Sequence, residues 1–142
     1  MKVVILAGGF GTRLSEYTNV IPKPMVEIGD KPILIHIMNW YKTFNFNDFI
    51  VATGYKSEFI NSYFENQLKS KDQEFNFETG EQHQLSKINE NFIVKTIYTG
   101  QNSMTGGRLL KLREYIDGDE FMVTYGDGLS NINISKLLEF HR

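Results

Sequence analysis

The sequence has 142 residues, of which 41% are hydrophobic and 23% charged, and its formal net charge is −2. This length and composition are typical of one globular domain and argue against a disordered chain. The slight negative charge argues against a nucleic-acid-binding module, and the lack of cysteine excludes a disulfide framework, a thiolate zinc site and a cysteine nucleophile. No apolar run approaches the roughly 18 residues of a membrane span, so we expect a cytoplasmic protein without a membrane partner.

The first predicted element is a strand over residues 2–7. Its apolar residues show almost no alternation, which is typical of a strand covered on both faces in a parallel sheet. Glycines at positions 8, 9 and 11 then predict a loop. Further along, Asp30 is expected to cap a helix whose first turn contains Pro32. Apolar residues between 33 and 44 recur at helical spacing and give this helix one apolar stripe.

The middle of the chain continues the alternation of strands and helices. A second buried strand is predicted over residues 49–53, and a second amphipathic helix over residues 59–68. Phe75 and Phe77 alternate with polar neighbours, which indicates an edge strand or the arm of a hairpin. After a polar stretch, a further strand is predicted over residues 92–98.

The last part of the chain repeats the pattern. A third helix is expected over residues 109–116 and a strand over residues 120–125, and Asn133 is placed to cap a final helix that carries Leu137 and Leu138 on one face. Strands that alternate with helices in this way predict βαβ units with right-handed crossovers. The expected fold class is therefore α/β, with a Rossmann-like, mostly parallel sheet flanked by helices.

A glycine-rich loop follows the first predicted strand. In open α/β sheets, ligands bind beyond the carboxyl ends of the strands. Glycines allow backbone N–H groups to approach phosphate oxygens closely, and Arg13 adds a planar guanidinium group that is permanently charged. The loop is neither a dinucleotide fingerprint, whose third glycine would fall at Leu14, nor a P-loop. The plain alternative is a tight turn into a helix.

Two charged residues occupy constrained positions. Asp127 lies between two glycines at the end of a predicted strand, where there is space for a metal ion and a polyphosphate. Lys23 lies between Pro22 and Pro24, which stiffen the segment and hold its ammonium group in place. The alternatives are an ordinary Gly-Asp-Gly turn and a solvated loop lysine.

The glycine loop with Arg13, Lys23 and Asp127, in this order, resembles the sugar-1-phosphate nucleotidyltransferase family, and the match runs through the whole chain. Six stretches carry a closer match to members within the family. The six stretches are residues 22–29, 31–34, 47–50, 54–56, 103–108 and 124–128. The resemblance implies the nucleotidyltransferase fold, with residues 1–142 as the N-terminal nucleotide-binding portion of a single domain. It places the sugar-binding portion and a second metal carboxylate after Arg142, so the 142-residue chain itself is expected to be inactive.

Within the family, the resemblance is strongest to members that act on CTP. It implies transfer of a cytidylyl group from CTP to α-D-glucose 1-phosphate, which gives CDP-glucose and pyrophosphate and requires Mg²⁺. Lys23 and Arg13 are the implied catalytic residues, and Asp127 is the implied magnesium ligand. The implied nucleotide-binding residues are Leu6, Ala7, Gly8, Gly9, Phe10, Gly11, Thr12, Arg13, Lys23, Ser103, Arg108 and Gly126.

Recognition of the base is expected from residues 103–108. Cytosine presents acceptors at O2 and N3, which suit a donor-only side chain such as Arg108. Ser103 and the small residues after it let the backbone approach the edge of the ring. The plain alternative is that this segment only begins the third predicted helix.

Two other functions stay open. One is a uridylyl- or thymidylyl-transferring relative, which a nucleotide-competition assay would separate. The other is a non-catalytic nucleotide-sensing module of the same fold, although intact Arg13, Lys23 and Asp127 argue against it. We also expect a homo-oligomer, because enzymes of this family are commonly symmetric oligomers.

Overall fold

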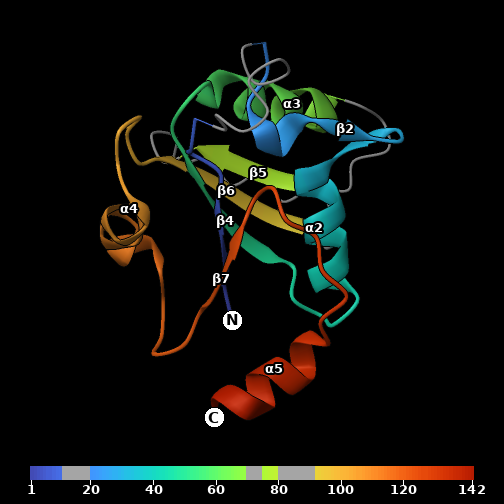
Figure 1. Ribbon diagram of the computed structural model, residues 1–142, viewed down its shortest axis with the longest axis vertical. Helices are drawn as coiled ribbons and strands as arrows, with labels where there is room; N and C mark the ends of the chain where they lie inside the picture. Colours follow the sequence, from blue (N-terminus) through green and yellow to red (C-terminus); the bar gives the residue numbers. More distant parts are fainter. Residues whose placement is uncertain (11–19, 70–74, 80–91) are drawn as a thin grey trace.

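A five-stranded parallel sheet forms the centre of the structure (Figure 1). This computed structural model describes residues 1–10, 20–69, 75–79 and 92–142. The strand order is β5-β6-β4-β1-β7. The strands are β1 (Val3–Leu6), β4 (Asp48–Thr53), β5 (Phe75–Thr79), β6 (Phe92–Tyr98) and β7 (Met122–Tyr125). The predicted α/β fold with a mostly parallel sheet is confirmed.

Strand β1 lies between β4 and β7, with Val3 opposite Phe49 on one side and Met122 on the other. All four residues of β1 are buried, which agrees with the unbroken apolar run in the sequence. Strand β5 is the edge strand expected around Phe75 and Phe77, and it pairs with β6 in parallel. Because the two arms of a hairpin are antiparallel, β5 and β6 do not form a hairpin with each other.

Helices cover both faces of the sheet. They are α2 (Ile33–Lys42), α3 (Ser57–Lys69), α4 (Thr105–Lys111) and α5 (Ile134–His141), with short 3₁₀ turns η2 (Lys23–Met25) and η3 (Arg113–Tyr115). Figure 1 shows α2 and α4 on opposite sides of the sheet. One apolar cluster joins α2, α3 and Ile134 to Val3, Ile5 and Phe49, and a second joins Leu112 to Val4 and Ile50. No helix in the described parts of the chain is long and apolar enough to cross a membrane.

The start of α2 differs from the prediction. Asp30 lies in the turn of a small antiparallel hairpin formed by β2 (Glu27–Ile28) and β3 (Lys31–Pro32), so it does not cap the helix. Pro32 pairs with Glu27 in this hairpin and is the N-cap residue in extended conformation. The helix therefore begins at Ile33, whose N–H donates to the carbonyl of Val26. A backbone hydrogen bond across the hairpin replaces the expected side-chain cap.

Two later elements also differ in extent. The third predicted helix is divided into α4 and η3 at Leu112, which is fully buried in the second apolar cluster. The strand predicted from residue 120 begins at Met122. The final helix begins as predicted, because the side chain of Asn133 accepts a hydrogen bond from the N–H of Lys136 at 3.0 Å.

Candidate functional site

A cavity of about 210 Å³ lies at the carboxyl ends of β1 and β7. In the sheet, β4, β5 and β6 all lie on one side of β1. The last strand, β7, pairs with β1 on its other side, so the order of strand addition reverses there. Such a reversal of strand order is where open α/β sheets bind their ligands. Eight sequence-predicted residues line the cavity: Leu6, Ala7, Gly8, Gly9, Lys23, Ser103, Arg108 and Asp127.

Lys23 and Asp127 form an ion pair inside this cavity. The Lys23 Nζ lies 2.7 Å from Asp127 Oδ2, and the two side chains are 25% and 33% exposed. Lys23 comes from η2, which follows the extended Pro22, and Asp127 follows β7. The N–H of Gly126 donates to the carbonyl of Leu6 at 2.9 Å and joins the end of β7 to the end of β1. Two opposite charges are thus held at one point of the cavity wall and stay accessible to solvent.

Arg108 points inward from α4 and hydrogen-bonds to the ends of three strands. Its Nη2 donates to the carbonyl of Gly8 at 2.8 Å, beyond β1. Its Nη1 donates to Thr99 Oγ1 at 2.7 Å and to the carbonyl of Gly100 at 2.8 Å, both beyond β6. A longer contact of 3.4 Å reaches the carbonyl of Thr53 at the end of β4. The guanidinium therefore joins β1, β4 and β6 at the floor of the cavity.

The positive charge of Arg108 is buried without an acidic partner. The residue is 5% exposed, and within the described ranges no carboxylate forms an ion pair with it. Burial lowers the pKa of Arg108, and the electrostatic effect of Tyr98 opposes this shift. A guanidinium nevertheless stays charged at neutral pH. A permanent positive charge thus lies directly behind the carbonyl of Gly8.

The hydroxyl of Ser103 also forms hydrogen bonds within the protein. Its Oγ donates to the carbonyl of Thr99 at 2.5 Å and accepts from Lys111 Nζ at 3.0 Å. Lys111 Nζ donates in addition to the carbonyl of Thr99 at 2.8 Å. The sequence reasoning missed Thr99 and Lys111, because neither belongs to a motif that is recognisable without the fold.

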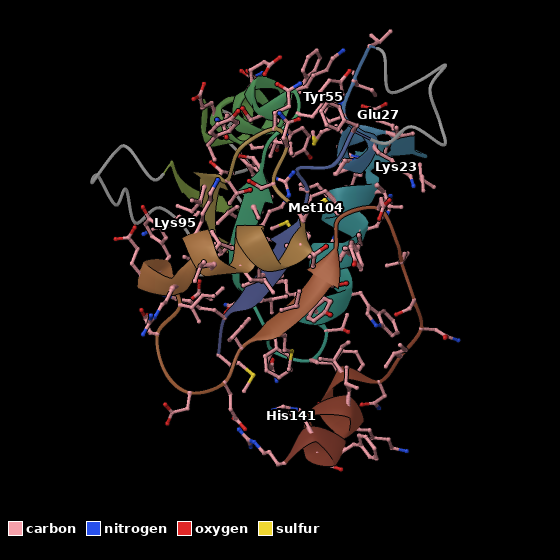
Figure 2. The ribbon with its side chains drawn as sticks, turned by 60° about the vertical axis from the view of Figure 1, so that its left-hand side comes forward. Lys23, Glu27, Tyr55, Lys95, Met104 and His141 are labelled. Atoms are coloured by element: carbon pink, nitrogen blue, oxygen red, sulfur yellow. The ribbon has the colours of Figure 1, made fainter. Side chains whose placement is uncertain are left out.

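The other predicted site residues are placed as follows. Phe10 packs on Tyr55 with a ring-centroid distance of 5.2 Å and is not among the lining residues. Gly11, Thr12 and Arg13 lie outside the described residues. Met104 and Tyr125 lie in the stretches 103–108 and 124–128 but were not among the predicted site residues. Both line the cavity, and they are 80% and 60% exposed. Figure 2 labels Lys23 and Met104, which enter the site from η2 and from the segment before α4.

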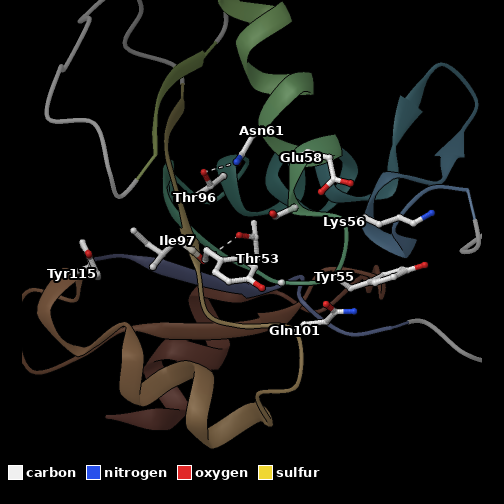
Figure 3. A pocket seen from close by; sticks show the side chains of 12 residues that line it. Thr53, Tyr55, Lys56, Glu58, Asn61, Thr96, Ile97, Gln101 and Tyr115 are labelled. Atoms are coloured by element: carbon white, nitrogen blue, oxygen red, sulfur yellow. Dashed lines mark hydrogen bonds between the residues drawn. The ribbon is translucent and has the colours of Figure 1, made fainter.

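A larger groove of about 840 Å³ lies beside β4, β6 and the start of α3 (Figure 3). Two of its hydroxyl groups are used inside the protein: Thr53 Oγ1 donates to the carbonyl of Ile97 at 3.2 Å, and Thr96 Oγ1 donates to Asn61 Oδ1 at 2.8 Å. It contains neither Lys23 nor Asp127 and does not lie at the reversal of strand order. We therefore assign the site to the smaller cavity.

Asp127 fits a magnesium ion that is shared with phosphates. Within the described ranges there is no group of three or more His, Asp or Glu side chains that could hold a metal on its own. Mg²⁺ is usually bound by one or two carboxylates together with substrate phosphates and water molecules. One partly exposed carboxylate beside a glycine turn supplies the protein part of such a set.

Comparison with known proteins identifies the family of this chain. Residues 2–142 match the profile of the nucleotidyl transferase family, and the chain belongs to this family. It is 49% identical to glucose-1-phosphate cytidylyltransferase of Salmonella typhimurium, covering 100% of this chain and 56% of the relative. It is 45% identical to the probable glucose-1-phosphate cytidylyltransferase of Bacillus subtilis, with the same coverage. The chain thus spans about half the length of these curated relatives.

A solved structure shares the fold. HddC from Yersinia pseudotuberculosis, crystallised in complex with GMP-PN, superposes with a TM-score of 0.72 at 28% identity. The match covers 98% of this chain and 53% of that protein.

Proposed function

We propose that this chain carries the nucleotide-binding portion of an enzyme that transfers a cytidylyl group from CTP to α-D-glucose 1-phosphate. The products are CDP-glucose and pyrophosphate. The observation that carries the proposal is the cavity that brings the Gly8 turn, Lys23 and Asp127 together at the ends of β1 and β7. The choice of CTP and glucose 1-phosphate is supported by the similarity to the Salmonella typhimurium relative.

The reaction needs alignment and charge neutralisation, and it needs no activated side chain. The nucleophile is a phosphate oxygen of the sugar phosphate, which is already ionised at neutral pH because its second pKa is about 6. This oxygen forms a bond to the α-phosphorus of CTP, and the bond from the α-phosphorus to the β-phosphate oxygen breaks. The leaving pyrophosphate takes the electron pair. Fixed positive groups stabilise the charge on the phosphates in this step.

The residues of the cavity divide this task between them. The backbone amides of the glycine loop would hold the triphosphate, with Arg13 as a second contact. The Lys23 ammonium would bridge the attacking and transferred phosphates. The Asp127 carboxylate would hold Mg²⁺, which when bound neutralises charge on the nucleotide phosphates. The ion pair of 2.7 Å supports this division, since it holds both side chains at one point of the cavity, where a single phosphate group would contact both.

Titration calorimetry tests the nucleotide part of the proposal. CTP, UTP and dTTP are titrated into the chain at one Mg²⁺ concentration. CTP is expected to bind about tenfold more tightly or better, because a mismatched donor or acceptor at the base leaves a buried polar group unpaired. Tighter binding of UTP or dTTP would instead identify a uridylyl- or thymidylyl-transferring relative.

A hybrid protein tests the reaction itself. The chain replaces the matched region of the Salmonella typhimurium relative, and pyrophosphate release is measured with CTP and α-D-glucose 1-phosphate. An enzyme is expected to release pyrophosphate only when both substrates are present. This release should be lost when Lys23 is replaced by methionine. A folded hybrid that binds CTP without releasing pyrophosphate would favour the nucleotide-sensing module. Sedimentation velocity of the same samples measures whether the expected homo-oligomer forms.

A further inference from the structure

The loop after β4 contacts the glycine loop after β1. The N–H of Tyr55 donates to the carbonyl of Gly8 at 3.3 Å, and the ring of Tyr55 packs on Phe10 with a centroid distance of 5.2 Å. The carbonyl of Gly8 also accepts from Arg108, so the backbone contact is shared between two donors. The ring contact with Phe10 is what the side chain of Tyr55 adds.

Lys56 connects this ring to a second segment near the site. Its Nζ donates to the carbonyl of Val20 at 2.9 Å and lies 5.4 Å from the ring centroid of Tyr55. A cation within about 6 Å of an aromatic ring is attracted to its face. Figure 3 shows the side chains of Tyr55 and Lys56 extending in the same direction from the loop after β4. Phe10 and Val20, the described residues on either side of positions 11–19, are thus held by two consecutive residues.

The backbone of Lys56 is not explained by local stability. Its φ of 51° is in the left-handed region, which a residue with a Cβ adopts only at a cost and a glycine adopts freely. Lys56 also directly precedes α3, and a cation is unfavourable at the N-terminal end of a helix. A lysine at this position is therefore best explained by the contacts of its side chain.

We propose that Tyr55 and Lys56 act together as positioning residues that hold the glycine loop in the shape that receives the triphosphate. The inference rests on the proposed function, because Gly8 and Gly9 line the candidate nucleotide cavity. Tyr55 and Lys56 line the larger groove and are not among the lining residues of the cavity. They therefore act through the loop. A loop that is already held loses less conformational freedom when its ligand binds.

The test compares CTP with inorganic tripolyphosphate, which has no base, by titration calorimetry on variants of the 142-residue chain. Tyr55→Leu removes the ring from Phe10, whereas Tyr55→Phe keeps it. Lys56→Met keeps the length of the side chain and removes its charge, whereas Lys56→Arg keeps the charge. Lys95→Met is the matched control, because it removes another ammonium group that lies over a ring, 5.5 Å from the centroid of Tyr115. Thermal melting checks that each variant folds, and Lys56→Met decides alone if Tyr55→Leu does not melt cooperatively.

Positioning predicts equal losses for the two ligands. Affinity for both should fall about threefold or more in Tyr55→Leu and in Lys56→Met. Tyr55→Phe and Lys56→Arg should retain most of the affinity, and Lys95→Met all of it. The double variant should lose less than the product of the two single losses, because the two side chains act as one unit.

Three results would overturn the proposal. They are a loss confined to CTP, an equal loss in Tyr55→Phe and Tyr55→Leu, and unchanged tripolyphosphate binding in folded Lys56→Met. Equal binding of CTP and UTP by the unaltered chain would contradict the cytidylyl assignment alone, because tripolyphosphate carries no base information.

Discussion

Replacement of Asp127 by asparagine separates the structural role of this residue from its chemical role. The amide keeps the shape of the side chain and removes the charge that pairs with Lys23 at 2.7 Å. Both side chains are exposed by a quarter or more, so solvent screens the pair and its contribution to stability is below about 1 kcal/mol. For a chain of this length, that corresponds to a fall in melting temperature of about 3 °C at most.

The chemical effect of Asp127→Asn is expected to be much larger. Loss of the carboxylate that holds Mg²⁺ removes several kcal/mol of charge stabilisation, or about 10²-fold or more in rate. Pyrophosphate release is measured in the hybrid protein, and CTP binding to the chain is titrated with Mg²⁺ and with EDTA. Asp117→Asn is the control, because it breaks the exposed ion pair with Lys2 far from the cavity. Full activity of folded Asp127→Asn, or an unchanged response of CTP binding to Mg²⁺, would refute the metal assignment.

Three further changes test the fold. Phe49→Ala should lower the free energy of unfolding in urea by about 3–5 kcal/mol, because the ring is fully buried. Asn133→Ala should destabilise α5 by about 0.5–2 kcal/mol and speed hydrogen exchange at the amide of Lys136, since it removes the helix cap. A hydrogen bond and the charge of Lys2 lower the pKa of Asp117 in the folded chain, so Lys2→Ala should raise this pKa in an NMR titration. The ion pair of Lys2 and Asp117 stabilises the folded chain at pH values above the unfolded pKa of Asp117. This stabilisation should disappear as the pH falls through the lower pKa of Asp117 in the folded chain.

The elements were predictable where local patterns and tertiary structure agree. The unbroken apolar run of β1 indicated a central strand, and the structure buries all four of its residues between β4 and β7. The prediction at Asp30 was wrong because a backbone contact across a small hairpin decides where α2 begins. The N–H of Ile33 bonds to the carbonyl of Val26 across a hairpin that no periodicity reveals.

The composition of the site was easier to predict than the direction of its side chains. Lys23 and Asp127 are 104 positions apart, and both line one cavity. The strand-end rule indicated Asp127, whereas Lys23 was assigned to the site from the family resemblance. Arg108 was expected in the same place because of its donor groups. Which way a donor points depends on its acceptors, and the three nearest ones, at 2.7 to 2.8 Å, belong to Gly8, Thr99 and Gly100, on the loops after two different strands.

Gly8 illustrates why motif reasoning gave a partial answer. The sequence suggested that its missing side chain lets a phosphate approach from outside the protein. In the structure, the same missing side chain admits the guanidinium of Arg108 from inside, where a Cβ would stand 2.1 Å from Nη1. The two demands are compatible because a planar peptide presents its carbonyl to one side and its N–H to the other. A side chain at Gly8 would therefore displace the guanidinium that donates to the Gly8 carbonyl.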